Sequence, residues 1–270
     1  MLSSKEIGII IPVHKAIPSE EEEEAISRAF HILNNYRFYF VAPRSLDLIR
    51  YKKFLEYSPE IIRFSDSYFN NGVDGYNQLM LSENFYINFS SCKYILIYQP
   101  DSFVFRDELM EWCKEGYDYI GAPWIDDRNR QINLNGVGNG GFSLRNVEKI
   151  LYIFTRCEIQ TVNNESIIKH RFHKIQNKTI TLRSNLFNLI GNKKTVYYRD
   201  KNLNEDGFWG LIAPKISCRY KTAPAREAVK FSFDRYPDVL YQMNDYKLPL
   251  GCHAWNKWNP EFWKNHISKL

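Results

Sequence analysis

The first half of the chain alternates short apolar runs with amphipathic stretches, and this alternation restricts the fold more than any other feature of the sequence. Segments of helical length separate the apolar runs, and crossovers of that length join parallel neighbours of one sheet. The pattern therefore predicts an α/β fold with a mixed, mostly parallel sheet flanked by helices. The expected strands are Gly8–Val13, Arg37–Val41, Ile61–Phe64, Tyr94–Tyr98 and Tyr117–Ala122.

The amphipathic stretches between these runs are expected to form helices. Ser19 and Glu22 have the spacing of a capping box, in which each side chain bonds the backbone N–H of the other residue. Acidic residues at the start of this segment favour the positive end of a helix. The expected helices are Glu20–Leu33, Leu46–Tyr57 and Gly75–Phe89.

The alternation fails from Asn133 onward, where clusters rich in glycine, asparagine and aromatic residues begin. A chain of 270 residues can bury one large core or two small ones, but no repeat and no Pro- or Gly-rich linker divides it. We therefore expect a single domain over 1–270, with halves of about 1–132 and about 133–270 and an insertion near 162–201.

Composition narrows the range of partners. The net charge of +5 favours an anionic partner such as a nucleotide or a phospholipid surface. Aromatic residues make up 16% of the chain, and the flat faces and polar edges of Tyr and Trp suit sugars and bases. Basic residues are interspersed with acidic ones and no nucleic-acid-binding signature is present, so we expect no nucleic acid among the partners.

The cysteines and the N-terminal sequence indicate a compartment. The five cysteines lie far apart and form no C-x-x-C pair, which argues against a disulfide framework or a structural zinc site. No signal-peptide pattern precedes the first expected strand, and no apolar run approaches the roughly 18 residues of a membrane span. We therefore expect a cytoplasmic protein.

The most informative motif is Gln99-Pro100-Asp101, which directly follows the buried strand expected at Tyr94–Tyr98. A carboxylate in this position lies at the C-terminal edge of a central strand, where open α/β sheets bind their ligands. The plain alternative is that Asp101 only begins a turn after Pro100.

A glycine-rich block follows later in the chain. Gly138, Gly140 and Gly141 permit positive φ and close approach of the backbone to a ligand, although the block lacks the residue order of a phosphate-binding loop. Arg145 closes the block, and it either lies at the site or pairs structurally.

Two further features suit the same site. The adjacent acids Glu205 and Asp206 point in different directions, so only one of them can act as a base toward a given substrate. Their plain alternative is a solvated helix start. His253 opens an aromatic and basic cluster, and a carboxylate combined with an imidazole suits Mn²⁺ better than Ca²⁺. Its plain alternative is a packed or exposed histidine.

In this order, the motifs resemble those of nucleotide-sugar-dependent glycosyltransferases with the GT-A fold, in particular a bacterial polysaccharide or lipopolysaccharide-type group. The resemblance spans Ile9 to Trp258, with Gln-x-Asp in place of the family's Asp-x-Asp and an Asn-Gly-Gly-Phe-Ser-Leu-Arg block beginning at Asn139. It implies one Rossmann-like GT-A domain, whose first half binds the nucleotide and whose second half holds the acceptor and the catalytic residues.

The resemblance also implies an activity. A hexosyl group would move, with inversion, from a nucleoside diphosphate sugar, most often of uridine, to a hydroxyl of a glycan or lipid-linked saccharide. Asp206 would remove the acceptor proton, and Glu205 would orient the acceptor or cap a helix. Asp101 and His253 would hold Mn²⁺ or Mg²⁺, while Gln99 could supply only a neutral hydrogen bond. Donor contacts would come from Pro12, His14, Lys15, Gln99, Asp101, Gly140, Gly141 and Lys257.

A catalytically silent carbohydrate- or nucleotide-binding module is the main alternative, because aromatic enrichment suits it equally well. Such a module would not need Asp101 and His253, which are distant in the sequence, to converge on one point. The aromatic and basic end of the chain, Trp255–Leu270, would either rest against an anionic inner face of a membrane or pack on the domain as a helix.

Overall fold

A six-stranded mixed sheet forms the centre of the computed structural model, which describes residues 2–126, 133–161, 194–198 and 204–267. The insertion expected near 162–201 lies outside the described residues, apart from one short strand. In spatial order, the sheet consists of β3 (Glu60–Phe64), β2 (Arg37–Pro43), β1 (Ile7–Pro12), β4 (Tyr94–Tyr98), β9 (Phe142–Asn146) and β6 (Tyr119–Ile120).

The first four strands are parallel to one another, and β9 and β6 complete the sheet in antiparallel pairings. This arrangement confirms the predicted mixed, mostly parallel sheet. After β3 the chain crosses to the other side of β1, so the strand order changes direction between β1 and β4. In open α/β sheets, ligands bind at the carboxyl ends of the strands at such a switch point.

Every residue of β1 and of β4 is buried, as expected for parallel strands that are covered on both faces. Their side chains belong to one large core shared with α1 (Glu20–Ile32) and with aromatic side chains of the later helices. The capping box predicted for α1 is confirmed, because the Glu22 N–H donates to Ser19 Oγ at 3.3 Å and the Ser19 N–H donates to Glu22 Oε2 at 2.8 Å.

Two of the expected helices are shorter than predicted. In the helix expected at Leu46–Tyr57, the Ile49 N–H donates to Asp47 Oδ1. This local turn moves the start of the helix to Ile49, where the chain forms a single 3₁₀ turn. In the helix expected at Gly75–Phe89, the backbone of Ser82 is extended and divides the segment into two helices. The observed elements are η2 (Ile49–Tyr51), α2 (Lys52–Leu55), α4 (Gly72–Met80) and α5 (Glu83–Ile87).

The last expected strand is also shorter, because residues at its ends bond to other segments. The Asp118 N–H donates to the carbonyl of Lys221, and the carbonyl of Ala122 accepts from the Gly138 N–H. Only the two residues of β6 remain in the sheet.

A second, three-stranded sheet joins distant parts of the chain. Its strands are β12 (Ser232–Phe233), β13 (Gly251–His253) and β5 (Ser102–Val104), with β13 parallel to β12 and antiparallel to β5. A smaller apolar cluster that includes Phe103, Phe233 and Trp263 packs beside it.

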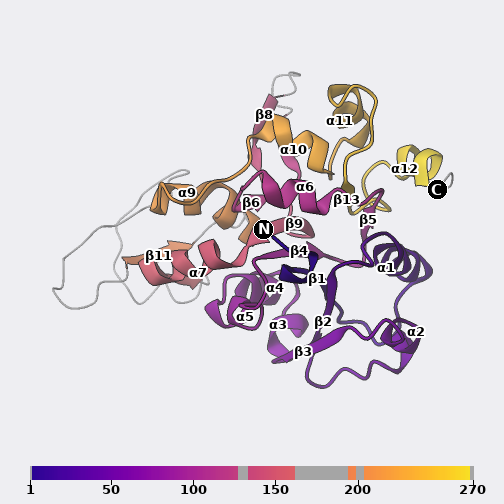
Figure 1. The fold of residues 1–270 in the computed structure, drawn as a ribbon, viewed down its shortest axis with the longest axis horizontal. Helices are drawn as coiled ribbons and strands as arrows, with labels where there is room; N and C mark the ends of the chain where they lie inside the picture. Colours follow the sequence, from indigo (N-terminus) through magenta and orange to yellow (C-terminus); the bar gives the residue numbers. More distant parts are fainter. Residues whose placement is uncertain (1, 127–132, 162–193, 199–203, 268–270) are drawn as a thin grey trace.

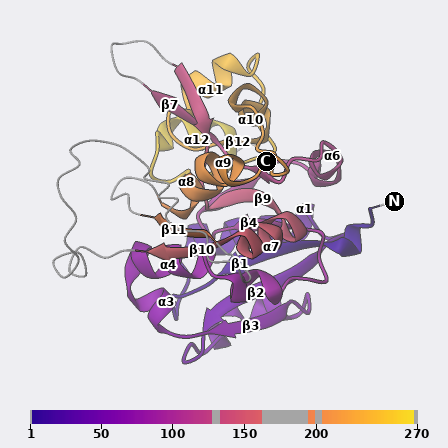
Figure 2. The same cartoon turned by 90° about the vertical axis from the view of Figure 1, so that its left-hand side faces the viewer.

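Helices α10 (Ala225–Phe231) and α11 (Pro237–Met243) of the second half lie at the opposite end of the molecule from β3 in both views (Figure 1, Figure 2). None of the described helices is long and apolar enough to cross a bilayer. The remaining elements are η1 (Ser4–Glu6), α3 (Ser67–Asn70), α6 (Leu109–Lys114), β7 (Pro123–Asp126), β8 (Asn133–Val137), α7 (Val147–Arg156), β10 (Cys157–Thr161), β11 (Lys194–Tyr198), α8 (Glu205–Gly207), the π-helical η5 (Phe208–Ile212), α9 (Ala213–Ile216) and α12 (Pro260–Ile267).

Candidate active site

The three-stranded sheet brings two predicted metal ligands together. In its register His253 of β13 pairs with Ser102 of β5, so His253 lies next to Asp101, the residue that precedes β5. The same sheet adds a third polar residue, because Phe233 of β12 pairs with the neighbour of His253 and Asp234 follows directly. Backbone pairing therefore gathers three segments beyond the carboxyl end of β4.

The imidazole of His253 has polar neighbours at both of its nitrogens. Nε2 lies 2.9 Å from Gln99 Oε1 and 3.3 Å from Asp101 Oδ1, whereas Nδ1 lies 3.6 Å from Asp234 Oδ1. Burial lowers the pKa of His253, but the two carboxylates outweigh it and raise the pKa to about 10. Burial raises the pKa of Asp101, and His253 outweighs this effect, so the pKa lies below its usual value.

Sequence reasoning missed Asp234. The signal was present, because Asp234 follows the short apolar segment Phe231–Phe233 in the way that Asp101 follows the strand at Tyr94–Tyr98. A two-residue strand is too short to recognise by its pattern, and its neighbours in the sheet are distant in sequence.

The glycines of the later block make room for side chains of the protein itself. A Cβ at Gly141 would lie 2.2 Å from Nε2 of His253, and a Cβ at Gly140 would lie 2.0 Å from Oε1 of Glu205. Positive φ is not the reason, because Gly138, Gly140 and Gly141 are not among the described residues that adopt it. That part of the prediction is wrong, and the close approach is to His253 and Glu205.

Glu205 and Arg145 form a buried ion pair at 2.8 Å, with exposed side-chain fractions of 1% and 0%. Arg145 also donates to the hydroxyls of Tyr86 at 2.8 Å and Ser143 at 3.0 Å, and its guanidinium lies 5.5 Å from the ring centre of Tyr119. Arg145 is therefore structurally paired. Burial also removes Glu205 from contact with an acceptor, so the geometry does not fit the expected acceptor-orienting role.

Asp206 points away from this pair and stays partly exposed. Its Oδ2 accepts the Asn139 N–H at 2.7 Å and its Oδ1 accepts the Gly207 N–H at 2.9 Å. Burial raises the pKa of Asp206 above its usual value even though both of these hydrogen bonds lower it, and the negative charge of Asp234 adds to the increase. Of the two adjacent acids, Asp206 is the one that retains access to solvent.

Predicted donor contacts lie at the end of β1. Pro12 is the last residue of that strand, and His14 and Lys15 follow as exposed residues. Lys15 pairs with Glu22 at 2.6 Å, and its charge contributes to the low pKa of Asp101.

Lys257 is exposed at the other end of the chain. Its Nζ lies 5.0 Å from the ring centre of Trp258, and the guanidinium of Arg235 lies 4.6 Å from the same ring centre. Two cations therefore share one indole close in sequence to Asp234 and His253.

In the described part of the chain, no three His, Cys, Asp or Glu side chains form a group that could hold a metal ion. The predicted site therefore has two expected protein ligands, Asp101 and His253. Mg²⁺ is commonly bound by only one or two carboxylates, and substrate phosphates and water complete its coordination.

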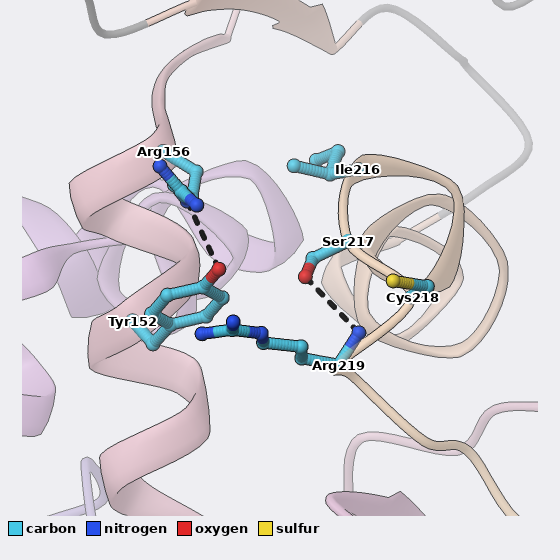
Figure 3. Close-up of a pocket in the computed structure, with 6 residues that line it drawn as sticks. All are labelled: Tyr152, Arg156, Ile216, Ser217, Cys218 and Arg219. Carbon is cyan, nitrogen blue, oxygen red and sulfur yellow. Dashed lines mark hydrogen bonds between the residues drawn. The ribbon is translucent and has the colours of Figure 1, made fainter.

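One cavity, of about 380 Å³, lies away from these residues (Figure 3). It lies between α7 and the chain after α9, where the Nε–H of Arg156 donates to the hydroxyl of Tyr152 at 3.0 Å. None of the predicted site residues lines it. The lining residues are Tyr152, Arg156, Ile216, Ser217, Cys218 and Arg219.

One solved glycosyltransferase structure shares the fold. The galactosyltransferase LgtC in complex with donor and acceptor sugar analogues matches with a TM-score of 0.51 and 12% identity, over 97% of this chain and 96% of LgtC. Mouse xyloside xylosyltransferase 1 matches with a TM-score of 0.48 and 10% identity, over 92% and 96%. At 12% identity the similarity to LgtC shows the fold alone, and this is the GT-A fold that the sequence resemblance predicted.

A third match is core-mannan synthase A from Aspergillus fumigatus in its Mn/GDP form, with a TM-score of 0.36 and 11% identity over 54% of this chain. The match spans only 60% of that enzyme. No curated protein sequence matches the chain.

The family model described as "Protein of unknown function (DUF5672)" matches residues 58–253. The matched region contains Gln99, Asp101, the acid pair at Glu205 and Asp206, and both Asp234 and His253. Because the match covers more than half of the chain, this protein belongs to the DUF5672 family.

Proposed function

We propose that this protein is a glycosyltransferase that moves a sugar from a nucleoside diphosphate sugar to a hydroxyl of a glycan or lipid-linked saccharide. The observation that carries the proposal is the contact between Asp101 and His253 beyond the carboxyl end of β4. That place is the ligand site of open α/β sheets. A carbohydrate-binding module without activity would have no use for such a pair beside a partly exposed acid.

The donor site proposed here combines residues of the first half of the chain with His253. Exposed His14 and Lys15 lie at the end of β1 and would contact the nucleotide or diphosphate. Asp101 and His253 provide a hard oxygen and an imidazole at 3.3 Å, a donor set that fits Mn²⁺ or Mg²⁺. A bound divalent ion would supply charge stabilisation for the diphosphate.

The acceptor side uses the second half. Asp206 accepts hydrogen bonds from two backbone N–H groups and is partly exposed as a residue, and we propose that it accepts the proton of an acceptor hydroxyl. Lys257 would meet the negative charge of the departing diphosphate. A single displacement with one base forms no covalent intermediate and inverts the anomeric configuration.

The biological setting in this proposal is bacterial polysaccharide synthesis in the cytoplasm, with uridine as the expected base of the donor. For the C-terminal segment, packing supports the helix alternative over membrane contact. Trp263 and Ile267 of α12 are buried, and Trp263 stacks on Phe105 at 5.7 Å between ring centres. The apolar face of α12, which would have to insert into a membrane, is covered by the domain.

Three variants test the mechanism together with the anomeric configuration of the product by NMR. Asp206→Asn should lose about 10²- to 10⁴-fold in rate while donor binding stays near normal, because a positioned base contributes that much. Asp101→Asn should lose both rate and donor binding. Glu205→Gln should affect folding stability more than donor binding, since Glu205 faces Arg145.

A product with retained configuration, or an Asp206→Asn enzyme with near-native turnover, would show that the base lies elsewhere. Binding of nucleotide sugars without any turnover would instead support the silent binding module.

A further inference from the structure

Asp234 and His253 face each other with atoms that have no other partner. Asp234 Oδ1 and His253 Nδ1 are both buried, and neither has a hydrogen bond to any described residue. They lie 3.6 Å apart, slightly beyond hydrogen-bond length. Buried polar atoms are rarely left without partners, so two such atoms directed at each other indicate a contact that closes in the working protein.

The opposite edge of the same ring faces the predicted metal ligand. Nε2 lies next to Gln99 Oε1 and Asp101 Oδ1, and the lone-pair directions of the two ring nitrogens diverge. A carboxylate beyond Nδ1 therefore cannot share an ion that Nε2 binds. This geometry argues against Asp234 as a third ligand, in agreement with the absence of a three-residue group among the described residues.

The fold fixes this relation through backbone pairing. Phe233 pairs with Cys252 in parallel strands, so Asp234 and His253 occupy the next position in the same register. The side chains are 23% and 19% exposed, which places the contact under the surface of the site. Asp234 thus directly follows a strand whose pairing with β13 places it beside His253.

We propose that Asp234 is a positioning residue for His253. It accepts the Nδ1–H and thereby sets the rotation of the ring, so that Nε2 stays directed at Asp101. Metal-binding histidines commonly donate their second N–H to a carboxylate in this way, and loss of that partner typically costs 10- to 100-fold in metal affinity. The metal in this inference rests on the proposed function, whereas the contact at Nδ1 does not.

The first readout is the ring of His253 in the metal-free protein, observed by ¹⁵N–¹H NMR with labelled histidine and assigned with His253→Gln. The wild-type protein should show a slowly exchanging Nδ1 proton, and Asp234→Ala should lose it. Asp238 is an exposed carboxylate of neighbouring α11 that accepts from Asn259 at 3.2 Å, so Asp238→Ala is a matched control and should keep the signal.

The second readout is Mn²⁺ affinity in the presence of nucleoside diphosphate, measured by the electron paramagnetic resonance of free Mn²⁺. Asp234→Ala should weaken binding 10- to 100-fold, and Asp234→Glu should recover part of the loss. Circular dichroism confirms that each variant is folded. An Asp234→Ala protein with an unchanged Nδ1 signal overturns the inference, whether or not metal binds. A wild-type protein that binds no Mn²⁺ would overturn the proposed metal site, while the ring signal still decides the role of Asp234.

Discussion

Replacing Arg145 by methionine should destabilise the protein strongly. Arg145 is fully buried and bonds Glu205, Tyr86 and Ser143, so its removal leaves the Glu205 carboxylate without a counter-charge at 1% exposure. Removing one partner of a buried ion pair typically costs about 3–5 kcal/mol. At about 2–4 °C of melting temperature per kcal/mol for domains near this size, we expect a decrease of about 6–20 °C.

The ion-pair argument also predicts the behaviour of a double variant. Arg145→Met combined with Glu205→Leu removes both charges, so the double variant should be less destabilised than the sum of the single variants. Arg37→Met is the matched control, because the Arg37–Glu60 pair is exposed and such pairs contribute only about 0–1 kcal/mol. Urea unfolding followed by circular dichroism gives the free energies. An Arg145→Met protein within about 0.5 kcal/mol of wild type would refute this reasoning, since that is the range of ordinary surface substitutions.

Three further predictions concern the site. Gly141→Ala should impair Mn²⁺-dependent nucleotide binding, measured by calorimetry, because the added Cβ would lie 2.2 Å from the His253 ring; unchanged binding would contradict the packing. Because burial raises the pKa of Asp206 and the base must be ionised, kcat/KM should fall as the pH drops through that raised pKa, and a pH profile without this limb would contradict the assignment. The full chain should not sediment with anionic liposomes at physiological salt, because α12 buries Trp263; sedimentation would revive the membrane alternative.

The local pattern was sufficient to predict the parallel half of the fold. β4 was predicted to the residue, and the capping box at Ser19 and Glu22 was predicted from spacing alone. Both depend on interactions within a few residues or on a continuous apolar run, which a single sequence displays. The short strand β6 was overestimated because its ends bond to segments that a local pattern does not indicate.

The candidate site depended on contacts between distant residues, and the sequence showed it only in part. The proximity of Asp101 and His253 could be expected from the resemblance, but the partner of Arg145 and the position of Asp234 could not. Glu205 lies 60 residues from Arg145 in sequence, and β12 has two residues, so neither interaction leaves a periodic signal. The glycines were recognised as sites of close approach, yet only the structure showed that protein side chains fill the space.

The most direct test of the central claim is thermal unfolding with UDP or GDP, with and without Mn²⁺, in the wild-type protein and in Asp101→Ala and His253→Ala. A ligand at about 100 times its Kd stabilises the folded state by about 2.7 kcal/mol, which corresponds to about 5–11 °C here. The account predicts such a shift for at least one nucleotide, only with Mn²⁺, in the wild-type protein and in neither variant. No shift with any nucleotide, or an equal shift in both variants, would contradict it.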